Sequence, residues 1–245
     1  MSEYELYYWP GIQGRGEFVR LALEAAGASY RDVARETGDG AGLEQMMRLL
    51  TAKAIERPPF APPFLKAGEL IIGQTANILM FLGARHGLAP AAEADRVWAN
   101  QLQLTIADFV AEIHDTHHPI AAGLYYEDQL EEAKRRTADF LEARAPKFLG
   151  YFEDVLARNK AGSAYLIGER LAYPDLSLFQ VVSGLRYAFP RAMTAFEKKL
   201  PLTVALHERV AAHPSIATYL ASPRRVPFNQ EGIFRHYPEL DSFGD

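Results

Sequence analysis

The chain has 245 residues, of which 49% are hydrophobic and 23% are charged, and its formal net charge is −5 at pH 7. This length allows one large domain or two small ones with a sizeable core, and the negative charge gives no general reason to expect a nucleic-acid partner. Cysteine is absent, which excludes disulfides, thiolate metal sites and any mechanism in which the protein supplies a thiol.

No apolar run approaches the roughly 18 residues needed to span a bilayer. The first residues, Met1-Ser2-Glu3-Tyr4-Glu5, are acidic and lack the basic and then apolar order of a signal peptide. We therefore expect a cytoplasmic protein without a membrane partner.

Residues 1–87 predict a small mixed sheet with helices on both faces. Residues 4–9 alternate and are rich in aromatic side chains, which favours a strand, and helical spacing follows from Arg15 to Gly27. Further elements are expected as a strand at 30–34, a short helix at 43–50, a hairpin from Phe64 to Ile72, and a helix from Thr75, its N-cap, to Gly87. This order predicts an α/β, thioredoxin-like domain with a four-stranded sheet.

Residues 88–93 are expected to be a linker, and residues 94–245 an all-helical domain with an irregular tail from Ser222. Helices are expected at 94–117, 127–159, 174–188 and 201–212. The second should bend at Pro146, because proline removes a backbone donor. The third is apolar on more than one face, which predicts a place at the centre of a helical bundle.

Tyr8 and Arg15 mark a candidate active site at the end of the first strand. The sequence from Tyr7 to Gly16, YYWPGIQGRG, places a phenol, a guanidinium and backbone N–H groups where ligands of α/β sheets bind. Arg15 stands at the positive end of a helix, which disfavours a cation. It could favour a bound anion, pair with Glu17 or cross to the helical domain, and the sequence leaves these alternatives open.

Two further motifs are typical of a ligand site. Ala61-Pro62-Pro63-Phe64-Leu65 is a proline loop that leads into a strand, and Gln74-Thr75 begins a helix. Free N–H groups at such a helix start can bind a carboxylate, although a plain N-cap is the simpler interpretation.

These motifs, together with Tyr173-Pro174-Asp175-Leu176, resemble those of the cytosolic glutathione transferases of the tyrosine type, nearest to sigma-like members. The resemblance covers most of the chain. It implies a homodimer without a metal that uses glutathione as co-substrate and conjugates it to an apolar electrophile. It also implies that Pro63 is preceded by a cis bond. The implied glutathione-binding residues are Tyr8, Lys53, Pro62, Pro63, Gln74 and Thr75.

By the same resemblance, the Tyr8 hydroxyl would stabilise the glutathione thiolate with help from Arg15. The segment between Tyr8 and Gly14 is one residue longer than in typical members, so Tyr7 remains an alternative. Pro62 has no N–H, so only its carbonyl could bond to glutathione there. Ala172 stands where the family usually has serine or threonine.

His114, His117 and His118 share one face of the expected helix 94–117, with Asp115 beside them. Such spacing can bind a metal, but we expect pocket lining and no metal. The residues assigned to the second-substrate pocket are Trp9, His114, His118 and Tyr125.

Two other functions remain open. One is a non-enzymatic ligand-binding or interaction protein on the same scaffold, and the other is a glutathione-dependent isomerase or peroxidase. The lack of cysteine argues against variants of the fold that need a protein thiol.

Overall fold

A four-stranded mixed sheet forms one end of the computed structural model, which describes residues 4–241. In space the strands follow the order β2-β1-β3-β4, with β1 parallel to β2 and antiparallel to β3, and with β3 and β4 forming a hairpin. The central strand pairs Leu6 with Asp32 on one side and with Leu65 on the other. The strand bounds are β1 Tyr4–Tyr7, β2 Tyr30–Asp32, β3 Phe64–Ala67 and β4 Leu70–Gly73.

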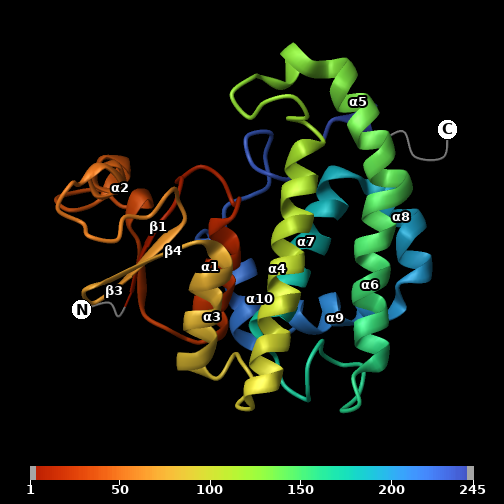
Figure 1. Ribbon diagram of the computed structural model, residues 1–245, viewed down its shortest axis with the longest axis horizontal. Helices are drawn as coiled ribbons and strands as arrows, with labels where there is room; N and C mark the ends of the chain where they lie inside the picture. The colour runs from red at the N-terminus through yellow and green to blue at the C-terminus, as the bar shows by residue number, and fades with distance from the viewer. Residues whose placement is uncertain (1–3, 242–245) are drawn as a thin grey trace.

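Helices cover both faces of this sheet. Helices α1 (Gly16–Ala25) and α3 (Thr75–His86) lie between the sheet and the remaining helices, whereas α2 (Gly42–Thr51) lies on the far face (Figure 1). The predicted order of strands and helices is confirmed. The first strand is shorter than predicted, because the chain turns after Tyr7, and Tyr8 and Trp9 lie beyond it.

The rest of the described chain forms a helical bundle. Its α-helices are α4 (Glu93–Asp115), α5 (Leu130–Asp139), α6 (Ala145–Arg158), α7 (Tyr173–Ala188), α8 (Pro190–Phe196), α9 (Pro201–Ala211) and α10 (Pro214–Leu220). Short 3-10 turns lie at Val33–Arg35, Tyr126–Gln129, Glu197–Lys199 and Pro238–Leu240. Within residues 4–241, no helix has the length and apolar character needed to cross a membrane.

The single helix expected at 127–159 is wrong in detail. A 3-10 turn opens it, and a π-helical segment, Phe140–Arg144, separates α5 from α6 just before Pro146. Because proline has no N–H, the regular bond to the fourth residue before it cannot form, and a wider turn is tolerated there. Helices α8 and α10 were not predicted. Both are short, and each begins with a proline, a residue that suits the first helical turn.

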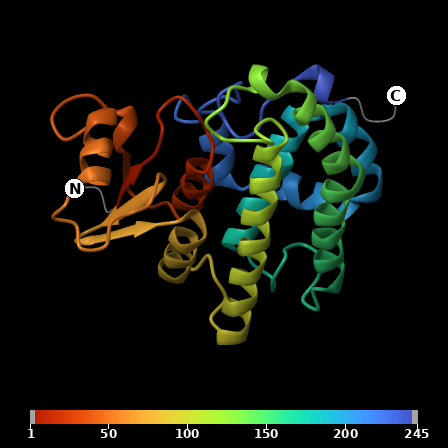
Figure 2. The same cartoon turned by 45° about the horizontal axis from the view of Figure 1, so that its top comes forward.

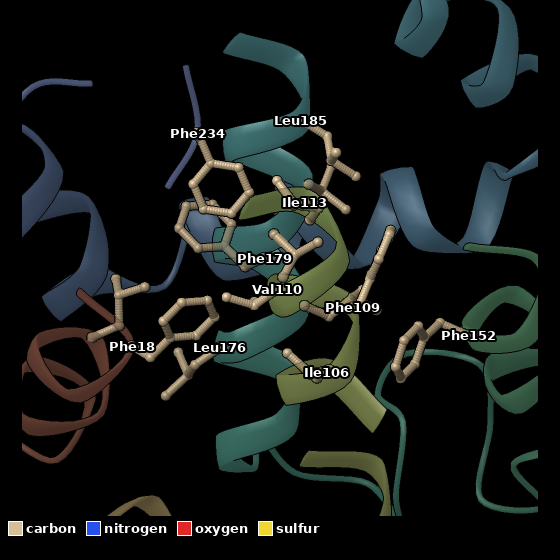
Figure 3. Close-up of a cluster of buried hydrophobic side chains, with 14 of the residues drawn as sticks. Phe18, Ile106, Phe109, Val110, Ile113, Phe152, Leu176, Phe179, Leu185 and Phe234 are labelled. Carbon is tan, nitrogen blue, oxygen red and sulfur yellow. The ribbon is translucent and has the colours of Figure 1, made fainter. Parts of the chain in front are cut away.

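Helix α7 lies at the centre of the bundle, as predicted, with most of its side chains buried. Phe18 of α1 points toward Leu176 of α7 within the same apolar cluster as Phe109 and Val110 of α4 (Figure 3). One continuous core therefore joins the sheet part to the helical part. The domain boundaries expected near residues 87 and 94 stay a prediction.

Candidate functional site

Tyr8 lies between the end of β1 and the start of α1, and only 4% of it is exposed. Glycines leave the space that its ring fills. A Cβ atom added at Gly14 would lie 2.0 Å from the Tyr8 hydroxyl oxygen, and one added at Gly16 would lie 2.4 Å from Cδ1 of the ring. Because real Cβ contacts are never this short, the two glycines are required for this position of the phenol.

The Tyr8 hydroxyl oxygen accepts the backbone N–H of Arg15 at 2.8 Å. No acceptor for the hydroxyl proton lies among the residues that the structure describes, so the proton is free for a ligand. Burial raises the pKa of Tyr8, although the Arg15 N–H and the charges of Arg15 and Arg20 oppose this rise. Tyr8 is therefore a protonated hydrogen-bond donor at neutral pH.

Tyr7 faces the opposite side of the sheet. Its hydroxyl donates to Glu5 at 2.6 Å, and its ring stacks on Phe64 with 4.6 Å between centroids. It packs with Val33 and Met46 in the small cluster beside α2. The proton of Tyr7 is thus already committed, and its ring points away from the start of α1.

Three of the predicted residues meet in one cavity. The cavity has a volume of about 420 Å³ and lies between α1, α3 and α4. Its lining comprises Arg15, Phe18, Gln74, Thr75, Ala76, Asn77, Met80, Asn100, Gln103, Leu104, Ile106, Ala107 and Val110.

Two buried oxygen atoms in this lining have no hydrogen-bond partner among the described residues: Oγ1 of Thr75 and Oε1 of Gln103. Gln103 is 2% exposed and was not predicted as a site residue. A glutamine between Leu102 and Ile106, on the apolar face of the helix, was the sequence signal that could have found it. Buried polar atoms without partners are costly, and these two suit a polar ligand.

The Arg15 guanidinium has no carboxylate partner among residues 4–241, so the alternative in which it pairs with Glu17 is wrong. Glu17 is fully buried and accepts hydrogen bonds from Arg20 and the Tyr219 hydroxyl instead. Burial lowers the pKa of His114, and the nearby charge of Arg15 lowers it further. The Arg15 charge therefore acts on both the cavity and the C-terminal end of α4.

The start of α3 is open. Gln74, not Thr75 as predicted, is the N-cap, and it has a φ of 67°. No side chain caps the helix, which leaves its first N–H groups for an anion.

The Pro62–Pro63 bond is cis, as expected, with Pro63 buried and Pro62 half-buried. Lys53 is exposed and lies outside the cavity lining.

The histidines at the end of α4 form one aromatic cluster. The ring centroids of His114 and His118 are 4.9 Å apart, and His117 contacts both rings. His117, which was not assigned to the site, is buried and bonds through Nε2 to the Ile233 carbonyl at 2.8 Å. Among residues 4–241, no group of three or more histidine or acidic side chains is arranged to hold a metal ion.

The structure does not bring together all four residues expected around the second substrate. Tyr125 is 78% exposed and Trp9 is also exposed, whereas His114 and His118 are half-buried.

Comparisons with known proteins found similar sequences. Residues 114–223 match a family model described as glutathione S-transferase, C-terminal domain. A glutathione S-transferase of Plasmodium falciparum is 24% identical over 227 residues, which cover 91% of this chain and 97% of that protein. Glutathione S-transferase P 1 of Xenopus laevis is 25% identical over 225 residues, which cover 92% of this chain and 95% of that protein.

Solved structures are similar over nearly the whole chain. The Pi-class glutathione S-transferase of Onchocerca volvulus superposes with a TM-score of 0.70 at 20% identity, covering 94% of this chain and 99% of that one. A glutathione S-transferase of Caenorhabditis elegans superposes with a TM-score of 0.68 at 24% identity, covering 93% of this chain and all of that one. These likenesses establish the fold.

Proposed function

We propose that the chain belongs to the cytosolic glutathione S-transferase family, to which its sequence and fold are similar, and that it is a tyrosine-type glutathione transferase. It would join the sulfur of glutathione to an apolar electrophile. The thiol proton passes to solvent, and the thiolate sulfur forms a new bond to an electrophilic carbon. One bond at that carbon breaks in return, and its electron pair departs with the leaving group. The lack of cysteine agrees with a thiol that arrives on the co-substrate.

The hydrogen bond between Arg15 and Tyr8 carries this proposal. It fixes the Tyr8 oxygen from the backbone side and leaves the hydroxyl proton for a thiolate. A hydrogen bond to a charged acceptor contributes roughly 1.5–3 kcal/mol, which lowers a thiol pKa by about one to two units. Such a change ionises a large share of the thiol near pH 7. Arg15, which has no carboxylate partner in the described part of the chain, adds a positive charge beside the anion.

Glutathione would be held by the cavity between α1, α3 and α4 and by the proline loop. The open N-terminus of α3 at Gln74 and Thr75 suits the γ-glutamyl carboxylate. The unpartnered Gln103 oxygen suits the ammonium group of the same residue. In the proline loop, the Pro62 carbonyl and the neighbouring Pro63 would meet the cysteinyl part. Lys53 would complete the set by attracting the glycyl carboxylate.

The apolar electrophile would lie toward the end of α4, near His114 and His118, with Trp9 and Tyr125 at the rim. Catalysis would come from thiolate activation and from holding the two reactants together. Neither step needs a metal. The sigma-like subgroup stays a prediction.

A homodimer is the proposed assembly, and its proposed interface is the apolar surface of β4, α3 and α4. Its exposed side chains include Leu70, Met80, Val97 and Leu104. Exposed apolar patches of this kind mark interaction sites. Sedimentation of the wild type and of Val97→Glu should show a dimer that the charge weakens. We expect this dimer in the cytoplasm.

The test is a pH titration of the thiolate absorbance of glutathione bound to the wild type and to Tyr8→Phe. The wild type should bind glutathione and lower its thiol pKa, and Tyr8→Phe should bind it with a thiol pKa that is higher by about one to two units. No binding to the wild type would refute the proposal. Binding without a lowered thiol pKa would favour a non-enzymatic carrier. If the thiolate persists in Tyr8→Phe, the role belongs to another group.

Assays with an arene electrophile, an isomerisable substrate and an organic hydroperoxide would then separate a transferase from an isomerase or peroxidase using the same thiolate.

A further inference from the structure

The segment after α10, residues 222–241, returns from the helical part to the turn between β1 and α1. We call it the strap, and we call residues 8–15 the β1–α1 turn. Both views show the strap, in blue, beside the red turn (Figures 1 and 2). Nδ2 of Asn229 donates to the Gly11 carbonyl at 2.8 Å, and Nε2 of Gln13 donates to the Val226 carbonyl at 2.5 Å. The strap therefore holds the turn at two points.

The strap is itself anchored to α7 and to the segment that follows α4. The Phe234 ring fills the space beside Gly184, where an added Cβ would lie 2.3 Å from the ring, and Phe234 lies near Phe179 in the main core (Figure 3). The Ile233 carbonyl is bonded to His117. A segment packed in this way can hold the turn in a fixed place.

Gln13 is 4% exposed, and both ends of its amide are used. While Nε2 donates to Val226, Oε1 accepts from Nε2 of Gln180 at 2.7 Å. Gln180 belongs to α7 and is fully buried. One side chain thus joins the β1–α1 turn to the central helix and to the strap.

Contacts of Arg225, which is half-buried, close these contacts into a ring. Nη2 of Arg225 donates to Oε1 of Gln180 at 3.3 Å, and Nη1 of Arg225 lies 3.3 Å from Oε1 of Glu17. The Glu17 backbone N–H then donates to the Gln13 carbonyl at 3.0 Å. Because an unpaired buried polar group is costly, such a network favours one arrangement of its members.

The ring of contacts reaches Tyr8 within two residues. Gly14 follows Gln13 with a φ of 43°, and its backbone approaches the Tyr8 hydroxyl so closely that no Cβ fits between them. Arg15 comes next and donates its N–H to that hydroxyl. A shift of Gln13 would move both contacts.

We propose that Gln13 is a positioning residue that uses the strap and α7 to set the place of the Tyr8 hydroxyl. This inference rests on the proposed thiolate role of Tyr8.

Gln13→Leu tests this, because leucine has a similar volume but can neither donate nor accept. The thiolate-to-thiol ratio of bound glutathione at pH 7 should fall about three- to tenfold, the size expected for one lost hydrogen bond. Amide hydrogen exchange at Arg15 and Gly16 should become faster. Gln230→Leu is the matched control. Gln230 is an exposed strap residue whose side chain, among the described residues, bonds only to the His236 carbonyl, and both readouts should stay as in the wild type.

The outcomes separate the inference from the proposed function. A wild type that does not lower the thiol pKa refutes the proposed function and the positioning role together. If the wild type lowers the thiol pKa of glutathione and Gln13→Leu lowers it equally, the positioning role alone is refuted. This holds whether or not amide hydrogen exchange becomes faster. If Gln13→Leu does not fold, Gln180→Met, which keeps the Val226 contact, is measured instead. An unchanged thiol pKa in that variant also overturns the inference.

Discussion

The backbone N–H of Arg15 lies 2.8 Å from the hydroxyl oxygen of Tyr8, so the first turn of α1 and the phenol form one unit. The unit depends on the absence of side chains at Gly14 and Gly16. A tyrosine that points from a strand end toward a helix start needs a glycine-rich turn of this kind, because the backbone itself has to contact the ring.

Gly16→Ala should therefore damage the site more than the fold. The new Cβ would lie 2.4 Å from the Tyr8 ring and would push it aside. We expect conjugating activity to fall at least about tenfold, which corresponds to about 1.4 kcal/mol of transition-state stabilisation. Steady-state kinetics measure the effect.

Gly11→Ala is the matched control for this change. Gly11 lies in the same turn, but an added Cβ there meets nothing within 4 Å. Its activity should equal that of the wild type. Equal losses of conjugating activity in Gly11→Ala and Gly16→Ala would contradict the role assigned to the contact between Gly16 and Tyr8.

Tyr7→Phe should leave the thiol pKa of bound glutathione unchanged. The Tyr7 hydroxyl donates to Glu5 on the face of the sheet that α2 covers, and so it has no proton to offer a thiolate. Stability should fall by about 1 kcal/mol through the lost hydrogen bond. Thiolate absorbance and urea unfolding measure the two effects. A raised thiol pKa would show that the two tyrosines are assigned the wrong way round.

Much of the sheet part could be predicted because its signals are local. Alternation in residues 4–9, the stop at Gly27 and the hairpin at Gly68 all depend on neighbours in sequence. The helical part was less predictable where helices are short. Helices α8 and α10 have seven residues each, too few for apolar periodicity to be read.

The candidate site could be predicted only in part, because some of its contacts join distant segments. Gln13 stands in a polar turn, and its burial follows from Val226, 213 residues away. Gln103 can be noticed in the sequence as a polar residue on an apolar helical face. That it lines the cavity depends on how α1 and α3 pack on α4. Sequence motifs therefore predicted Tyr8 as a site residue. The side of the sheet that the Tyr7 side chain faces depends on tertiary packing, which local motifs do not show.

Asp175→Ala should strongly destabilise the protein. The buried carboxylate accepts the N–H groups of Leu166 and Ala172 at 2.8 Å each, and so it fixes both the start of α7 and the loop before it. Loss of this cap leaves two buried donors unpaired, at a cost of about 2–4 kcal/mol in the free energy of unfolding. Chemical denaturation measures it.

Asp154→Ala serves as its control. Asp154 pairs with Arg158 at 3.5 Å on the exposed face of α6, and an exposed ion pair of this type contributes less than about 0.5 kcal/mol. A similar loss in the free energy of unfolding in the two aspartate variants would contradict the role of Asp175 as the cap of α7.

His117 should make the protein less stable in acid. Burial lowers the pKa of His117 to about 3, and the charges of Arg235, His114 and His118 act in the same direction, while the bond to the Ile233 carbonyl opposes them. In the unfolded chain the pKa of histidine is about 6.5. Above that pH neither state carries the charge, and the full stability is present. As the pH falls from about 6.5 toward 3, the unfolded chain binds a proton that the folded one resists, and stability is lost.

The loss attributable to His117 should reach about 2 kcal/mol at pH 5. His117→Gln keeps a donor for the Ile233 carbonyl but does not titrate, so its free energy of unfolding should change less between pH 8 and pH 5 by about this amount. Urea unfolding of both proteins at the two pH values measures the difference. An identical pH dependence would mean that His117 is protonated as easily in the folded protein as in the unfolded chain.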